Sequence, residues 1–330
     1  MSKDLVLVTG AGGFIGGHLV RTLLDEGFKV RAVDIKPFHR WYQLHDGVEN
    51  IEGDCSKLDV CMAITKDVAD VYNLSADMGG MGFIENNKAL CMLTVLINTH
   101  LLMGAKENGC KRFFFASSAC VYAGYKQKDP NITGLAEEDA YPADAEDGYG
   151  WEKLFSERMC RHFMEDFGLH CRVARFHNVY GPQGTYAGGR EKAPAAMCRK
   201  VVDAITSGKS DIEIWGDGHQ TRSFMYIDDC TKGIRMIMDS NIEYPINLGS
   251  AEKVSINELL SVVEDIADVK LNRNYKLDAP KGVNGRNSIN TLIQKELGWE
   301  PSIPLRDGME KTYVWIKDQM DRGINPDKFD

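Results

Sequence analysis

Tyr149 and Lys153 are the first residues whose types and spacing could do chemistry. Residues four positions apart on a helix project from one face, so an ammonium would lie beside a phenol. Such a neighbour is expected to lower the pKa of the phenol from its reference value of about 10 and make it a usable base near neutrality. Because tyrosine and lysine are also common on exposed helix faces, the pair predicts proton exchange with a hydroxyl only in a suitable context.

That context begins with a glycine-rich loop between a predicted strand and a predicted helix. Glycines there permit a tight turn and a close approach of the backbone to a pyrophosphate, which the amino terminus of the helix favours electrostatically. The loop could also be a simple turn, but the strand before it and the helix after it favour a dinucleotide site. The loop residues expected at this site are Gly10, Gly13, Phe14, Ile15 and Gly16.

Two carboxylates indicate which dinucleotide binds. Asp34 ends the second predicted strand, where it can accept hydrogen bonds from ribose hydroxyls and would repel a 2′-phosphate. NAD is therefore favoured over NADP, although nearby Arg31 and Lys36 leave the NADP alternative open. Asp54 follows the third predicted strand and is either an adenine contact or a solvated turn residue.

The first half of the chain alternates short β-branched runs with longer amphipathic stretches, which is typical of βαβ units. Predicted strands cover residues 5–9, 30–34, 49–53, 71–74, 112–116 and 171–175, and predicted helices cover 14–26, 92–107 and 151–167. The expected fold is α/β, a Rossmann-type doubly wound parallel sheet with a smaller α/β substrate lobe. We expect the NAD-binding domain in residues 1–176 and the substrate lobe mainly in 177–330, with segments at about 223–250 returning to the first domain.

Charge and composition exclude several classes of protein. The 39 basic and 48 acidic residues give a net charge of −9, which argues against a nucleic-acid protein and requires any anion site to be local. The nine cysteines are scattered without zinc-ligand spacing, so we expect reduced thiols and no metal site. We identify no signal segment and no apolar window approaching membrane-spanning length, so we expect a cytoplasmic protein with no membrane partner.

Ser117 and Ser118 follow the fifth predicted strand, at the sheet edge where ligands bind in such folds. Together with the glycine loop, Ser118, Tyr149 and Lys153 resemble the extended short-chain dehydrogenases/reductases of the NAD-dependent epimerase/dehydratase family. Asn98 and the segment 178–182 extend this resemblance.

This resemblance implies a nucleotide-sugar substrate and NAD, with Tyr149 and Lys153 contacting the cofactor as well as acting in catalysis. It also implies a homodimer that pairs through the helices predicted at residues 92–107 and 151–167, an expectation that the apolar content of these helices supports.

Six stretches are similar to one group within this family, the GDP-mannose 3,5-epimerases; they are residues 77–83, 117–122, 175–178, 188–194, 215–224 and 285–288. In that group NAD oxidises C4 of the sugar, the ketone acidifies the protons at C3 and C5, and an acid and a base invert these carbons before hydride returns. The resemblance assigns the acid/base pair to Cys120 and Lys192, and it implies GDP-L-galactose and GDP-L-gulose as products. A lone cysteine after a strand is otherwise usually a small core residue, and Lys192 could be a solvated loop lysine.

The same resemblance implies contacts with a GDP-sugar. Arginine suits forked phosphate contacts, glycines permit close approach to the sugar, and amides can supply further hydrogen bonds. The expected substrate-binding residues are Gly79, Met81, Gly82, Ser118, Asn178, Lys192, Lys200, Gln220, Arg222 and Arg286.

Two other functions remain open at this point. A nucleotide-sugar 4-epimerase or 4,6-dehydratase would use the same fold, but a dehydratase normally carries an acidic residue near Ser118, where this chain has Ala119 and Cys120. A non-catalytic NAD-binding regulator would be expected to lose Ser118, Tyr149 or Lys153, and all three are present.

Overall fold

The computed structural model describes residues 4–279 and 282–324, and its centre is a seven-stranded sheet in which every pairing is parallel. From one edge to the other the strands are β10 (Ile246–Leu248), β6 (His170–Phe176), β5 (Arg112–Ser118), β4 (Asp70–Asn73), β1 (Leu5–Thr9), β2 (Lys29–Asp34) and β3 (Glu49–Glu52). Because parallel strands end at one edge, the loops that follow β1, β2 and β5 gather there.

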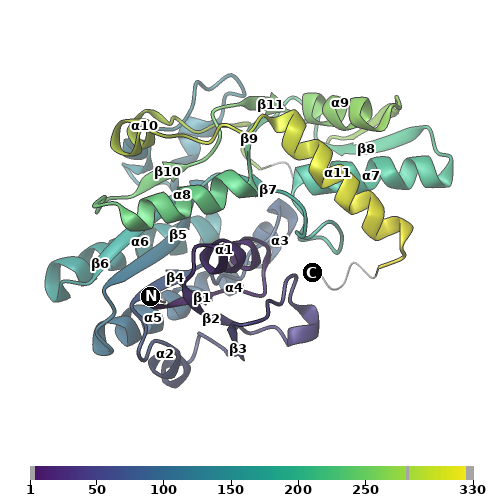
Figure 1. Ribbon diagram of the computed structural model, residues 1–330. Helices are drawn as coiled ribbons and strands as arrows, with labels where there is room; N and C mark the ends of the chain where they lie inside the picture. Colours follow the sequence, from purple (N-terminus) through teal and green to yellow (C-terminus); the bar gives the residue numbers. More distant parts are fainter. Residues whose placement is uncertain (1–3, 280–281, 325–330) are drawn as a thin grey trace.

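Both faces of this sheet are buried, because successive apolar side chains alternate between two cores. On β1, Val6 and Val8 belong to one core and Leu7 to the other. Figure 1 shows the helices that cover the two faces. Helices α1 (Phe14–Asp25) and α8 (Ile227–Asp239) pack together over the first core, and α2 (Leu58–Ile64), α5 (Val95–Glu107) and α6 (Asp147–Phe167) cover the second.

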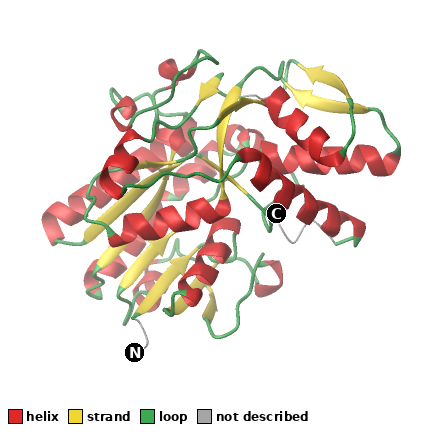
Figure 2. Ribbon diagram, turned by 45° about the horizontal axis from the view of Figure 1, so that its top comes forward, coloured by secondary structure: helices red, strands yellow, loops and turns green. Residues whose placement is uncertain are grey.

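A smaller lobe lies beside the main sheet (Figure 2). Its strands are β7 (Asn178–Tyr180), β9 (Thr221–Tyr226), β11 (Lys253–Ser255) and β13 (Gly285–Arg286), with β8 (Asp211–Trp215) and β12 (Asn272–Lys276) as a separate parallel pair. Its helices α7 (Ala193–Ser207), α9 (Ile256–Ala267) and α11 (Leu305–Asp321) pack on one another. Ser255 and Glu258 start α9 with reciprocal side-chain to backbone hydrogen bonds of 3.1 and 2.7 Å.

Several short helices and turns complete the fold. Helices α3 (Met81–Asn86) and α4 (Lys88–Leu93) precede α5, and α10 (Thr291–Leu297) packs near β10. Single 3-10 turns cover Phe38–Arg40, Ala119–Val121, Gly124–Gln127 and Glu137–Ala140.

The expected fold class is confirmed, with three local differences. Strand β5 includes Ser117 and Ser118, so these residues end the strand instead of following it. Helix α6 begins at Asp147 rather than at residue 151, which places Tyr149 and Lys153 in its first two turns. Within the segment expected to return at about 223–250, α8 and β10 lie on the main sheet, whereas β9 belongs to the small lobe.

The expectation about apolar windows needs a correction. The helical stretch Lys88–Glu107 is long and apolar enough to cross a membrane by length and composition alone. Core helices of soluble proteins pass the same test, and α5 within this stretch packs against α2 and α6. The nine cysteines are free and buried, in agreement with the expected reduced thiols.

Candidate active site

The glycine loop after β1 has the backbone geometry that only glycine accommodates. Gly10 has a φ of +71°, and a side chain there would begin 2.9 Å from the Leu74 carbonyl carbon. A Cβ on Gly16 would lie 2.1 Å from the Gly10 carbonyl oxygen. Gly13 precedes α1 without a side-chain cap, so the first amides of α1, beginning at Phe14 and Ile15, face the loop. Uncapped amides at a helix start fit a pyrophosphate.

Asp34 ties the end of β2 to this loop. Its carboxylate accepts hydrogen bonds of 3.0 Å from the amides of Gly12 and Lys36, and burial raises its pKa. Asp54 is partly exposed and accepts a hydrogen bond of 2.8 Å from the Ser56 amide. The Asp34 carboxylate beside the loop fits an adenosine ribose, so the residues present suit NAD.

Tyr149 and Lys153 lie where β5 meets α6. The Lys153 ammonium lies 5.6 Å from the centre of the Tyr149 ring and 4.8 Å from that of Phe115, and both Tyr149 and Lys153 are buried. The predicted lowering of the phenol pKa is wrong for the protein alone. Burial raises the pKa of Tyr149 well above its usual value, and a hydrogen bond with Ser118 opposes this rise only in part.

Cys120 is held against the start of α6. The Ser118 hydroxyl accepts a hydrogen bond of 3.2 Å from the Cys120 amide, and the Glu146 amide donates one of 2.9 Å to the Cys120 carbonyl. A side chain on Gly150 would begin 2.2 Å from that carbonyl oxygen. The backbone that carries the thiol is therefore fixed beside Ser118. The thiol itself lies 3.5 Å from the Arg286 guanidinium and in one buried cluster with Tyr149, and burial raises its pKa.

Two glycine-rich motifs that are distant in sequence pack against each other. The Gly80 amide donates a hydrogen bond of 3.0 Å to the Arg190 carbonyl, and the Arg190 guanidinium lies 3.9 Å from the centre of the Phe83 ring. A Cβ on Gly79 would lie 2.9 Å from Phe83, and one on Gly80 would lie 2.7 Å from the Glu191 carbonyl oxygen. The motif at 77–83 thus sets the position of the loop that carries Lys192.

Lys192 occupies the residue before α7 and is partly exposed. Burial of its ammonium lowers its pKa, and the charges of Cys120 and Arg286 also act on it. A lowered amine pKa favours proton exchange near neutrality. Lys192 and Cys120 therefore share one electrostatic neighbourhood, as the acid/base hypothesis requires.

Arg222 and Arg286 are partners across the parallel β9–β13 pair. Burial, together with repulsion from Arg286, lowers the pKa of Arg222 to about 10. Arg286 donates to the Gln127 amide oxygen at 2.7 Å, the Glu146 carboxylate at 2.5 Å and the Cys120 thiol at 3.5 Å. The two guanidiniums bring positive charge to this part of a molecule that is acidic as a whole. Diphosphate binding by these arginines stays a prediction.

Sequence reasoning missed Glu146 and Gln127. The only local signal was an acidic residue three positions before Tyr149, and such residues are common in the first turn of helices. Their partner Arg286 is more than a hundred residues away in the chain, so only the folded structure brings them together.

The remaining expected substrate residues lie in or beside the small lobe. Lys200 donates a hydrogen bond of 2.8 Å to the Glu213 carbonyl, and Gln220 donates one of 2.9 Å to the Trp215 carbonyl. The Gln220 side-chain oxygen is buried without a hydrogen-bond partner among the described residues. Asn178 donates to the Ser223 carbonyl at 3.2 Å. In α3, the Met81 side chain lies 3.1 Å from where a Cβ on Gly282 would be, and a Cβ on Gly82 would lie 3.7 Å from the Trp215 ring. Their substrate contacts stay predictions.

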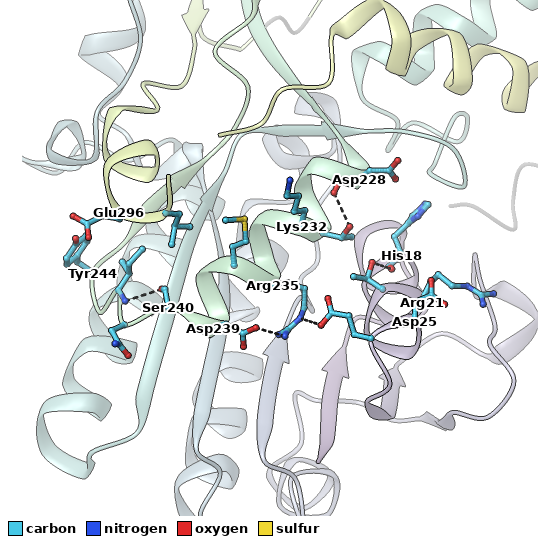
Figure 3. Close-up of a pocket in the computed structure, with 17 residues that line it drawn as sticks. His18, Arg21, Asp25, Asp228, Lys232, Arg235, Asp239, Ser240, Tyr244 and Glu296 are labelled. Atoms are coloured by element: carbon cyan, nitrogen blue, oxygen red, sulfur yellow. Dashed lines mark hydrogen bonds and ion pairs between the residues drawn. The ribbon is translucent and has the colours of Figure 1, made fainter. Parts of the chain in front are cut away.

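A cavity of about 1110 Å³ lies elsewhere, between α1 and α8 (Figure 3). Within its lining, Arg235 binds Glu26 at 3.1 Å and Asp239 at 2.7 Å. It contains none of the catalytic residues expected from the sequence. We place the active site at the carboxyl edge of the main sheet because the glycine loop, Cys120 and Tyr149 meet there.

Comparisons with known proteins identify the family of this chain. The sequence model of the NAD dependent epimerase/dehydratase family matches residues 6–249. GDP-mannose 3,5-epimerase 1 of Oryza sativa subsp. indica is 46% identical over 321 residues, which cover 97% of this chain and 83% of that protein. The chain therefore belongs to the NAD-dependent epimerase/dehydratase family, and within it to the GDP-mannose 3,5-epimerases. It is accordingly an isomerase that uses NAD.

Solved structures support the fold and the cofactor. UDP-glucose 4-epimerase from Thermotoga maritima has a TM-score of 0.87 at 24% identity, over 96% of this chain and 99% of that one. MoeE5 in complex with UDP-glucose and NAD has a TM-score of 0.80 at 26% identity, over 96% of this chain and all (100%) of that one. The expected NAD cofactor is therefore confirmed.

Proposed function

We propose that this enzyme inverts C3 and C5 of GDP-mannose to give GDP-L-galactose, and that it gives GDP-L-gulose where C5 alone is inverted. The observation that carries the proposal is the Cys120 thiol, buried in one cluster with Tyr149 on a backbone fixed beside Ser118, with Lys192 in the same electrostatic neighbourhood. The choice of GDP-mannose as substrate is taken from the name of the relatives. A 4-epimerase needs only the tyrosine for proton transfer and would not need a further acid/base pair such as Cys120 and Lys192.

The residues divide the work between oxidation and inversion. When bound, NAD accepts hydride from C4 of the sugar and later returns it. Tyr149 takes the proton from the C4 hydroxyl while Ser118 hydrogen-bonds that oxygen, and Lys153 holds the nicotinamide ribose. The resulting C4 ketone acidifies the protons at C3 and C5. Cys120 and Lys192 then remove a proton from one face of the sugar and supply one to the other.

The local electrostatics support binding of an anionic substrate. The arginine pair at Arg222 and Arg286 brings two guanidiniums close to Cys120, and arginine suits forked contacts with a diphosphate. Gly79 and Gly80 have no room for a Cβ because Phe83 and the Glu191 carbonyl fill that space, whereas a Cβ on Gly82 would meet the Trp215 ring at an ordinary 3.7 Å. We therefore expect the sugar to approach this segment at Gly82.

We also propose that the enzyme is a homodimer. Apolar side chains are 39–57% exposed along the consecutive helices α4 and α5 and along α6, which packs against both. Exposed apolar surface of this kind often marks a protein interface. A second copy related by twofold symmetry would cover these chains and form a four-helix contact. They are Leu90, Met92 and Leu93 on α4, Leu96 and Met103 on α5, and Trp151 and Phe155 on α6.

The substrate proposal is tested by incubating the purified protein with NAD and GDP-mannose in deuterated water and analysing the sugar by NMR. Deuterium at C3 and C5 with galacto and gulo products is expected. An unchanged, unlabelled sugar would contradict the proposal. UDP-glucose in a parallel incubation distinguishes the alternative 4-epimerase, which would invert C4 without deuterium at C3 or C5.

A further inference from the structure

The inversion step leaves a question about protons, because the Cys120 thiol is only 7% exposed. A buried thiolate that takes a proton from carbon must pass it to another group before the next turnover. Glu146 forms an ion pair with Arg286, and it is the carboxylate whose charge acts directly on this thiol. We propose that Glu146 relays protons between the Cys120 thiol and solvent.

Glu146 is attached to Cys120 through both backbone and side chain. Its amide donates a hydrogen bond of 2.9 Å to the Cys120 carbonyl. Its carboxylate accepts a charged hydrogen bond of 2.5 Å from Arg286, and the same guanidinium lies 3.5 Å from the Cys120 sulfur. The carboxylate and the thiol therefore lie against one guanidinium and are held at a fixed separation.

The other side of Glu146 reaches water. Its side chain retains 13% exposure and lines a cavity of about 490 Å³ together with Glu85, Gln127 and Asn284. Ordered water in a polar cavity of this size can carry a proton to bulk solvent. Glu146 thus lies between a buried thiol and a route to solvent.

The charges around the pair favour an ionised carboxylate and a protonated thiol. Burial alone would raise the pKa of Glu146, but Arg286 and a hydrogen bond with Cys120 hold it below its usual value, so the carboxylate is ionised. For the thiol, burial raises the pKa, Glu146 raises it further and Arg286 lowers it. The titratable groups that face the thiol from the surrounding elements are Glu146, Arg286, Arg222, Lys192 and Tyr149.

The relay balances in protons and charge. The Cys120 thiolate takes a carbon-bound proton from the sugar and becomes a thiol, and the electron pair stays on the sugar as an enolate of the C4 ketone. The thiol then gives its proton to the Glu146 carboxylate, which restores the thiolate and forms a carboxylic acid. This transfer is uphill, because the carboxylate is the weaker base, and loss of the proton to water completes it. Glu146 releases this proton to water in the cavity, and the reverse sequence serves protonation.

The test compares Glu146→Gln with the matched control Glu85→Gln, which removes another carboxylate that lines the same cavity. The first measurement is the pH dependence of Cys120 alkylation by iodoacetamide in the NAD-loaded enzyme, followed by peptide mass spectrometry. Removal of a carboxylate close to the thiol should move the midpoint down by about one pH unit or more. Glu85→Gln should leave the midpoint unchanged.

The second measurement is deuterium uptake from deuterated water into GDP-mannose, and this half rests on the proposed function. Uptake at C3 and C5 should fall at least about tenfold in Glu146→Gln, because an abstracted proton that cannot leave Cys120 returns to the sugar. Glu146→Asp keeps an acceptor and should restore part of the uptake.

The two measurements fail separately. An alkylation midpoint that stays or rises in Glu146→Gln would overturn the coupling between carboxylate and thiol, with no sugar involved. A lower midpoint with full deuterium uptake would overturn the relay. If the wild type does not act on GDP-mannose, the proposed function fails while the alkylation result still decides the coupling.

Discussion

Gly150 lies directly against the backbone of Cys120, and its replacement by alanine should separate the two. The new methyl carbon would lie 2.2 Å from the Cys120 carbonyl oxygen and 3.1 Å from the carbonyl carbon, whereas ordinary contact begins at 3.4 Å. Both neighbours are backbone atoms, so no side chain can rotate to make room. The start of α6 or the 3-10 turn that carries Cys120 must therefore shift by about 1 Å.

A shift of this size has a predictable effect on rate and stability. Misplacement of a reacting group by about 1 Å costs on the order of 100-fold in rate, and forced overpacking costs about 1–3 kcal/mol of stability. Gly150→Ala should thus lose about 100-fold in kcat for GDP-mannose and unfold at lower temperature. Gly124→Ala is the matched control, because its methyl would meet the Asp144 carboxylate at an ordinary 3.4 Å. A Gly150→Ala enzyme with wild-type kcat would refute the assigned position of Cys120.

Three further predictions test the frame around the site. Arg175→Ala should cost about 3–5 kcal/mol in urea unfolding, because it leaves the buried Glu157 carboxylate without its cation; Arg161→Ala, in an exposed pair, should leave the unfolding midpoint unchanged, and equal midpoints for the two variants would contradict this. Asp34→Ala should weaken NAD binding and reduce discrimination against NADP in fluorescence titrations, and an unchanged NAD/NADP ratio would place ribose recognition elsewhere. Phe155→Asp should yield monomers in sedimentation, whereas Val314→Asp, at an exposed position of α11, should leave the dimer intact. A dimeric Phe155→Asp protein would exclude the proposed interface.

Local sequence signals predicted the main sheet well. The strands at residues 5–9 and 112–116 agree with β1 and most of β5, because their β-branched and aromatic runs are bounded by turns. The β8–β12 pair was not predicted. Strand β12, with the sequence Asn-Arg-Asn-Tyr-Lys, has no apolar alternation to mark it.

Motifs identified the residues of the site but not their contacts. The glycine-rich stretches at 77–83 and 188–194 were separate similarities in the sequence, and the fold joins them through Gly80 and Arg190. Likewise, the pKa of Tyr149 could not follow from the Tyr149–Lys153 spacing alone, because burial dominates it. The Arg175–Glu157 ion pair had no local signal either, because the two residues lie 18 positions apart in the chain. Its Glu157 carboxylate also accepts a hydrogen bond of 2.6 Å from the Ser117 hydroxyl.

The central claim is that Cys120 and Lys192 exchange the protons of the sugar. The most direct measurement is deuterium uptake at C3 and C5 of GDP-mannose in Cys120→Ala and Lys192→Ala, with NAD binding measured in parallel. Each variant should lose exchange at both carbons and still bind NAD. Wild-type uptake in either variant would contradict the acid/base role of that residue.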